Sequence, residues 1–198
     1  MVSLNRLQTR LDNQDADTLL RELADDGLPA DLPLRVRLSS EPAAVLGLTL
    51  QAAGRLCGPH LLTAWRHRLI SCLDDQGRFS DDPAVQAAAI AGLLASGHAG
   101  DPTVEQALAA LTRQQDDTGL FRFADDHDDF DRYRTSAFIH WLLGDHPLFR
   151  SMIRCADFDD ALRETADHFG LDVSTPIAPP NSPDPDPSPT PMLAAIAA

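Results

Sequence analysis

The sequence predicts an all-α fold of stacked helix hairpins, and two observations lead to this expectation. A short acidic turn with a glycine and a phenylalanine occurs twice before an apolar helix, at residues 73–79 and 114–121, and its glycines, Gly77 and Gly119, are 42 positions apart. Alanine- and leucine-rich segments with helical spacing flank both turns. A period of about 20–50 residues is typical of repeat proteins, whose units bury their apolar faces by stacking.

Glycine and proline separate the expected helices, because these residues end or begin helices. The first, at about 4–24, carries leucines at helical spacing and leads into a fainter copy of the turn at 23–28. Residues 35–38 alternate polar and apolar side chains after two prolines, and we interpret them as a connector. The remaining helices are expected at about 42–56, 61–73, 84–96, 103–115, 132–143 and 158–169.

Three of these helices have recognisable starts, at 39–42, at Asp82-Pro83 and at Asp101-Pro102. A short oxygen-bearing side chain accepts a hydrogen bond from the first helical turn, and proline needs no hydrogen-bond partner there. Residues 125–131 carry five aspartates and are expected to form an acidic loop. In the two turns, glycine permits a positive φ and the phenylalanine is expected to pack under the next repeat.

Composition limits the possible partners and compartments. The net charge of −14 disfavours nucleic acid and anionic membrane surfaces, both of which need basic protein surfaces. Three cysteines without a CxxC pair favour free thiols in a reducing compartment. Neither a signal peptide nor an apolar run of about 20 residues is present, so we expect a cytoplasmic protein without a transmembrane segment.

The chain is expected to form one α/α-repeat domain at residues 1–172, followed by a tail at 173–198. Eight prolines crowd this tail. A segment of this composition cannot bury enough apolar surface to offset the entropy lost on ordering, so we expect it to be disordered.

The second turn resembles a known repeat. Gln114-Gln115-Asp116-Asp117-Thr118-Gly119-Leu120-Phe121 is similar to the Gln-x-x-Asp-Gly-x-Trp/Phe signature of squalene–hopene cyclases, other class II terpene cyclases and protein prenyltransferase β-subunits, with one residue inserted before the glycine. The similarity covers about residues 20–145. It implies a partial or reduced α/α toroid, whose inner helices line an apolar cavity in the family.

The acid cluster that follows the second turn matches two catalytic motifs. Asp126, Asp128 and Asp129 match the Asp-x-Asp-Asp proton donor of class II terpene cyclases, because a crowded carboxylic acid retains its proton to higher pH. Asp125, Asp126 and Asp129 match the Asp-Asp-x-x-Asp motif that holds Mg²⁺ and diphosphate in class I synthases. The third interpretation is an exposed acidic loop that caps the next helix.

The prenyltransferase resemblance argues against zinc. That family carries Asp-x-Tyr-His-Thr after this turn, and here the matching residues are Asp131-Arg132-Tyr133-Arg134-Thr135. Arginine cannot replace the zinc-binding histidine, so zinc chemistry is not expected and Mg²⁺ is the one cofactor left as an alternative. Arg132 and Arg134 are expected either to pair with the acid loop or to receive a diphosphate. Tyr133, His140 and Trp141 complete the set of candidate ligand-binding residues.

Three functions remain open at this point. The first is an α/α-repeat module that binds a hydrophobic or isoprenoid-like ligand or a partner protein, without zinc chemistry. The second is a small terpenoid cyclase or isoprenoid-diphosphate enzyme that uses residues 125–129. The third is a subunit of a larger complex, in which oligomerisation completes the ring.

Overall fold

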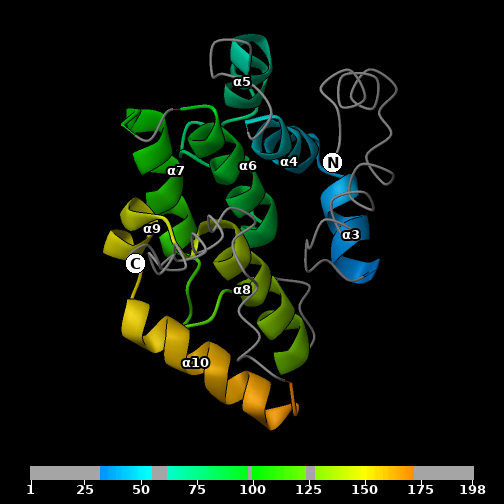
Figure 1. The fold of residues 1–198 in the computed structure, drawn as a ribbon, viewed down its shortest axis with the longest axis vertical. Coiled ribbons are helices and arrows are strands. Elements are labelled where there is room, and N and C mark those ends of the chain that lie inside the picture. The colour runs from blue at the N-terminus through cyan, green and yellow to red at the C-terminus, as the bar shows by residue number, and fades with distance from the viewer. Residues whose placement is uncertain (1–31, 55–61, 98–99, 124–127, 172–198) are drawn as a thin grey trace, which may run out of the picture.

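The computed structural model describes residues 32–54, 62–97, 100–123 and 128–171. The predicted helix at 4–24, the faint turn at 23–28 and the tail lie outside these ranges. The described ranges contain helices and no strand, which confirms the all-α prediction (Figure 1). The helices are α3 (Leu32–Ser39), α4 (Pro42–Gly54), α5 (Thr63–Ile70), α6 (Pro83–Ala95), α7 (Pro102–Thr112), α8 (Asp129–Leu143), α9 (Pro147–Met152) and α10 (Cys155–His168).

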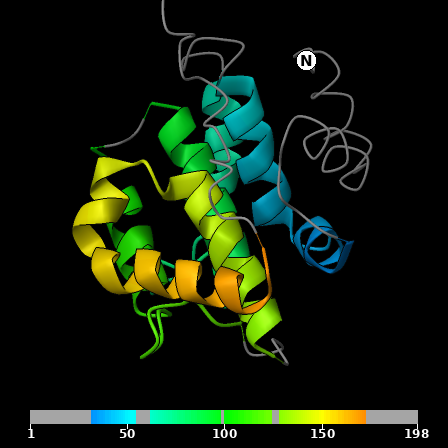
Figure 2. The ribbon, with the colours of Figure 1, turned by 60° about the horizontal axis from the view of Figure 1, so that its bottom comes forward.

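Helix α6 lies at the centre of the molecule, in contact with α4, α8 and α7. All of its residues from Pro83 to Leu93 are buried. Helix α7 packs against α9, and α10 crosses α8 (Figure 2). The described helices therefore pack together around α6, while stacked hairpins and their closure into a partial toroid stay predictions. In the part of the chain that the structure describes, no helix is both long and apolar enough to cross a membrane.

Helices α4 and α6 touch backbone to backbone through small residues. A Cβ atom added at Gly47 would stand 2.2 Å from the Ala88 carbonyl oxygen, and one added at Gly54 would stand 2.7 Å from the Ala95 carbonyl oxygen. Conversely, a Cβ at Gly92 would meet the Gly47 oxygen at 2.5 Å. Because these contacts advance along both helices in the same direction, α4 and α6 run parallel.

The interpretation of residues 35–38 as a connector is wrong, because they belong to α3. Leu34 and Leu38, four residues apart, are 3% and 0% exposed, whereas Val36 is 58% exposed. This is burial with the period of a helix. Proline is tolerated in a first helical turn, so Pro33 does not prevent the helix.

Arg37 attaches α3 to the start of α6. Its Nε lies 2.7 Å from Oδ2 of Asp82, and its Nη2 donates to Oγ1 of Thr135 at 3.0 Å. Burial raises the pKa of Asp82 by more than the charge of Arg37 lowers it. The same carboxylate accepts a hydrogen bond from Ala84 N at 2.8 Å, which confirms Asp82 as the cap of α6.

Several boundaries differ from prediction. Helix α8 begins at Asp129 and not at Arg132, so the acidic loop is shorter than expected. The reason is the cap, since Asp128 Oδ1 accepts a hydrogen bond from Asp131 N at 2.8 Å. The short helix α9 was not predicted, and α10 begins three residues earlier than expected, at Cys155.

The two turns have the same backbone conformation. Gly77 and Gly119 have φ values of +79° and +92°, as predicted from their glycines. In the first turn Asp74 N donates to Arg78 O, and in the second Asp116 N donates to the oxygen four residues later, both at 2.8 Å. In each turn the amide two residues after the aspartate donates to its Oδ1 at 2.8 Å.

A buried polar side chain of a neighbouring helix supports the phenylalanine of each turn. Phe79 N donates to Oε1 of Gln86 at 2.7 Å, and Phe121 N donates to Oγ of Ser136 at 2.8 Å. Gln86 also donates to the Gly77 and Ala107 oxygens, at 3.2 and 2.9 Å. Both supporting side chains are 0% exposed, so each turn is joined to the core by fully buried hydrogen bonds.

Candidate functional site

The described members of the acid cluster stand at the start of α8. Asp125 and Asp126 lie outside the described residues. Asp128 is exposed and caps the helix, as noted above. The Asp129 side chain is 70% exposed, and its Oδ1 accepts a hydrogen bond from Arg132 Nη1 at 2.7 Å. The interpretation of this cluster as a cap with an arginine partner therefore matches what these two aspartates do.

Arg132 connects the start of α8 to the second turn. Its Nη2 forms an ion pair with Oδ2 of Asp116 and donates to Oγ1 of Thr118 at 2.8 Å. The Arg132 side chain is 17% exposed. Burial alone would lower its pKa, but the hydrogen bonds and charges of Asp116 and Asp129 raise the pKa above the ordinary value. Arg132 is thus a firmly charged group whose two terminal nitrogens are already engaged.

Asp116 is the acceptor at the centre of this network. Burial opposes its charge, yet hydrogen bonds from Thr118 and Arg132 hold its pKa below the ordinary value of 3.8. Its backbone oxygen also accepts a hydrogen bond from Arg154, the residue before α10. The second turn, α8 and α10 therefore meet at one residue.

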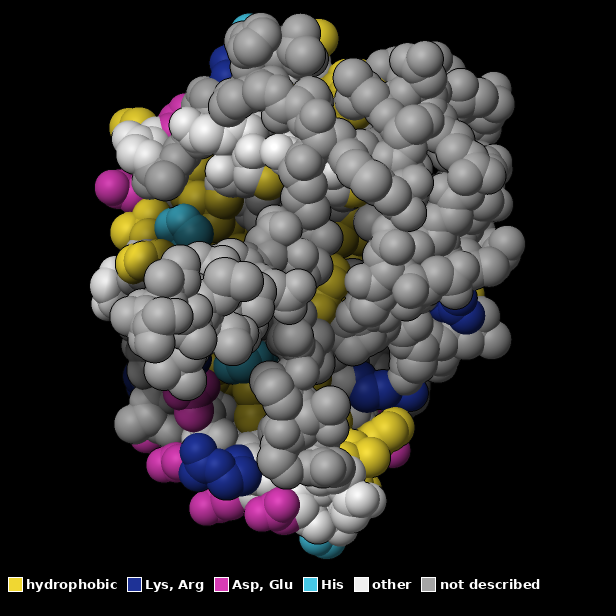
Figure 3. Space-filling view, viewed as in Figure 1, with side chains coloured by type: hydrophobic (Ala, Val, Ile, Leu, Met, Phe, Trp, Pro, Cys, Tyr) yellow, Lys and Arg dark blue, Asp and Glu magenta, His cyan; other side chains and the backbone are white. Residues whose placement is uncertain are grey.

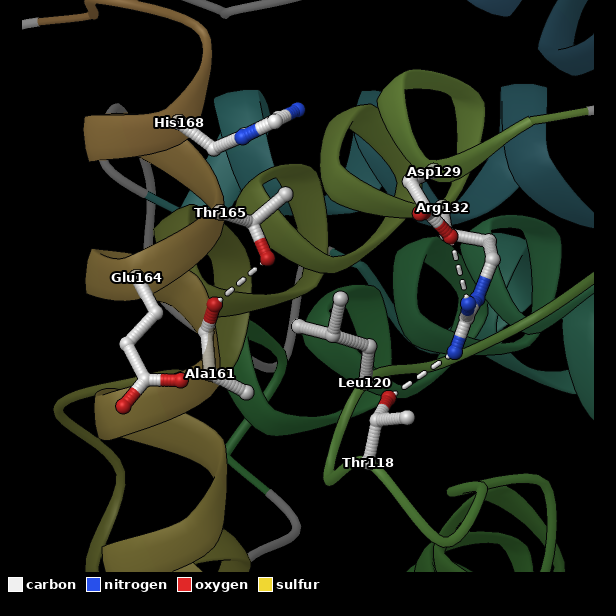
Figure 4. A pocket seen from close by; sticks show the side chains of 8 residues that line it. All are labelled: Thr118, Leu120, Asp129, Arg132, Ala161, Glu164, Thr165 and His168. Carbon is white, nitrogen blue, oxygen red and sulfur yellow. Dashed lines mark hydrogen bonds and ion pairs between the residues drawn. The ribbon is translucent and has the colours of Figure 1, made fainter.

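A pocket of about 300 Å³ opens where these three elements meet (Figure 4). One wall is the face of α10 that carries Glu164, Thr165 and His168, with spacing that places them on one side of the helix. Figure 4 shows Asp129 and Arg132 of α8 on the opposite side, with Leu120 between the two walls. The lining is completed by Thr118 and Ala161.

Negatively charged side chains outnumber positively charged ones around the pocket. Glu164 is exposed and forms neither a hydrogen bond nor an ion pair with any residue that the structure describes. Arg132 is the guanidinium of the lining, and the carboxylates of Asp116 and Asp129 already neutralise it. Acidic side chains are also visible at the lower end of the molecule, over α10 (Figure 3). The pocket therefore has an excess of negative charge.

Tyr133 and Arg134 lie on α8 but do not line this pocket. Arg134 forms an ion pair with Asp131, and its guanidinium carbon is 5.0 Å from the centre of the Phe130 ring. The Tyr133 ring stacks on Phe130 at 6.4 Å, and burial raises the Tyr133 pKa. These residues build an aromatic and charged surface beside the pocket.

His140 and Trp141 lie in the second half of α8 and do not line the pocket either. Nε2 of His140 is 3.9 Å from Oδ1 of Asp159, whose two carboxylate oxygens also accept hydrogen bonds from Arg150 at 2.9 and 2.8 Å. Burial, followed by the charge of Arg150, lowers the His140 pKa. The Trp141 ring stacks on Phe138 at 6.3 Å.

The residues that the structure describes contain no group of three His, Cys, Asp or Glu side chains able to hold a metal ion. Because Asp125 and Asp126 are not among those residues, the Mg²⁺ site at Asp125, Asp126 and Asp129 stays a prediction. The absence of zinc chemistry likewise stays a prediction, and Arg134, at the position that the resemblance assigns to a zinc histidine, forms an ion pair with Asp131.

Sequence reasoning missed the contribution of α10 to the pocket. The sequence predicts a helix at about 158–169 but assigns no binding role to it. The available signal was the spacing of Ala161, Glu164, Thr165 and His168 along one helical face. That spacing becomes a pocket wall only because Arg154 and α8 position the helix against the second turn.

Comparison with protein-family models, with curated proteins and with solved structures finds no match to this chain.

Proposed function

We propose that this chain is a non-catalytic α-helical repeat module that binds a partner protein. The observation that carries the proposal is the structural use of the charged residues at the start of α8. Asp128 caps the helix, Asp129 pairs with Arg132, and Arg132 pairs with Asp116. Side chains that hold a turn to a helix in this way are not free to transfer protons or to receive a diphosphate.

The exposure of Asp128 and Asp129, the described members of the acid cluster, also disfavours proton donation to an alkene. A carboxylic acid that must keep its proton near neutral pH needs an apolar surrounding. Asp128 is exposed, and the Asp129 side chain is 70% exposed. The positive end of the α8 dipole adds an attraction for negative charge at this position.

A partner protein fits the surface better than a small apolar ligand does. The pocket is open and carries charged and hydroxyl side chains, and Phe130, Tyr133 and Phe169 form an aromatic cluster next to it. Aromatic rings beside polar groups are typical of protein interfaces. Stacked hairpins offer extended surfaces of this kind, and a net charge of −14 favours a partner with a basic face.

A product assay tests the non-catalytic part of the proposal. The full chain is incubated with squalene, farnesyl diphosphate or geranylgeranyl diphosphate, with and without Mg²⁺, and we expect no product. The matched variant is Asp128→Asn, whose amide oxygen retains the cap but not the acid. Product that is lost in this variant, at an unchanged unfolding midpoint, would contradict the proposal and restore the terpenoid enzyme.

A selection experiment tests the binding part. Random displayed peptides are selected on the immobilised full chain, and the enriched peptide is titrated by calorimetry. We expect saturable one-to-one binding by a basic peptide, weakened by salt because the attraction is electrostatic. Failure to enrich any peptide above a denatured-chain control would count against a partner-binding module.

A further inference from the structure

We infer that the pocket between α8 and α10 receives a lysine or arginine side chain of the partner protein. The inference rests on the proposed partner-binding function and names the chemical group that the site recognises. It commits to a side chain of a partner and not to a free amine.

The first reason is charge. Arg132 engages Asp116, Thr118 and Asp129 through its terminal nitrogens, so it offers little to an incoming anion. Glu164, on the opposite wall, has no ionic or hydrogen-bonding partner among the described residues. An ammonium or guanidinium group placed at the α10 wall would pair with Glu164. A carboxylate or phosphate there would be repelled by it.

The second reason is shape. Leu120, only 3% exposed, and Ala161 give the pocket an apolar portion next to its carboxylates. Lysine and arginine bury their aliphatic stems on apolar surface while their charged ends reach polar groups. A volume of about 300 Å³ is at the lower limit for ligand pockets, which suits one long side chain.

The third reason is the neighbouring aromatic surface. Phe130 follows Asp129 in α8, and Phe169 follows His168 at the end of α10, with the two rings in edge-to-face contact at 5.1 Å. Phe169 is 38% exposed. Residues that flank the basic side chain would find apolar and cation–π contacts there, which a free amine lacks.

The test uses the peptide from the selection described above and a second version in which its central basic residue is norleucine. Both are titrated against the full chain, against Glu164→Gln and against the control Asp160→Asn. Asp160 is an acidic residue of the same helix whose partner is Arg163 and which does not line the pocket. Backbone NMR spectra report which amides move.

We expect Glu164→Gln to weaken binding of the basic peptide about fivefold. This loss corresponds to the upper end of the range for an exposed ion pair. The norleucine peptide should be insensitive to Glu164→Gln, and Asp160→Asn should bind both peptides like the unmodified chain. The amides of Leu120, Glu164 and Thr165 should shift with the basic peptide.

Two results would overturn the inference. If a peptide binds but Glu164→Gln leaves its affinity unchanged, the pocket is not the site, although the partner-binding function stands. If putrescine shifts the same amides and binds as tightly as the peptide, the pocket recognises a free amine. Absence of any binding peptide contradicts the proposed function itself, so the two failures are distinguishable.

Discussion

The two turns have the same backbone conformation and differ in the arginine that pairs with their aspartate. In the first turn, Asp74 pairs with Arg78 of the same turn, at 3.0 Å. In the second, the residue at the position of Arg78 is Leu120, and Asp116 pairs with Arg132 of α8. The arginine partner therefore belongs to the turn itself in the first case and to the following helix in the second. The aspartate and the left-handed glycine are common to both turns.

This difference accounts for the pocket beside the second turn. Leu120, at the position of Arg78, contributes an apolar side chain to the pocket, and the ion pair between Arg132 and Asp116 joins α8 to the turn. The first turn is a structural connection alone. The second combines the same connection with part of the lining of the candidate pocket, so the candidate site is found by what differs between the two turns.

The largest expected effect concerns the buried side chains behind the turns. Gln86→Leu leaves Phe79 N, Gly77 O and Ala107 O without their partner, which should lower the free energy of unfolding by about 3–4 kcal/mol. Ser136→Ala removes the partner of Phe121 alone and should cost about 1–2 kcal/mol. Urea unfolding measures both. The exposed Gln76→Leu is the control, and equal losses for Gln86→Leu and this control would be contrary to the expectation.

The glycines provide the second test. Alanine at either position is strained by the positive φ, but the added Cβ has different neighbours. At Gly119 it would meet the Asp157 backbone oxygen at 2.7 Å, whereas at Gly77 it would meet the movable side chain of Gln106 at 2.4 Å. We therefore expect losses of about 2–3 kcal/mol for Gly119→Ala and about 1 kcal/mol for Gly77→Ala in thermal unfolding. The reverse order would mean that α10 is not firmly seated.

The smallest effect is a dependence on pH. Because the Asp116 pKa is held below 3.8, this residue stabilises the folded state above pH 3.8, and the contribution is lost as the pH falls through the lower folded-state pKa. Asp116→Asn should lower stability at pH 7 by less than about 1 kcal/mol and flatten the acid limb of the stability curve. Asp74→Asn should flatten it less, since the Asp74 side chain is 41% exposed and that of Asp116 is 24% exposed. Equal curves for the two variants would remove the distinction between the turns.

The sequence predicted the features of the fold that depend only on residues close together in the chain. The caps at Asp82 and Asp101 and the left-handed glycines depend on neighbouring residues, and they occur as expected. Residues 35–38 were misassigned because four alternating residues fit a strand as well as a helix. Only the burial of Leu34 and Leu38 against other helices decides between them.

The candidate site was predictable only in part. Pairing of Arg132 with the acid cluster was expected from their closeness in sequence, and Asp129 confirms it. The pairing of Arg132 with Asp116, sixteen residues away, depends on how the turn folds back on α8. Glu164 enters the site from α10 through tertiary packing, and its spacing from Ala161 and His168 shows only that the three share one helical face.

The backbone contact at Gly47 and Gly92 has a consequence for the order in which the molecule opens. Helices α4 and α6 meet without intervening side chains, so neither can separate gradually, and their amides should exchange with solvent only on global unfolding. Helix α10 covers only one flank of the molecule and its outer face is polar, so its amides should exchange through local opening. Local opening of α10 would then widen the pocket while the contact between Gly47 and Gly92 holds α4 and α6 together.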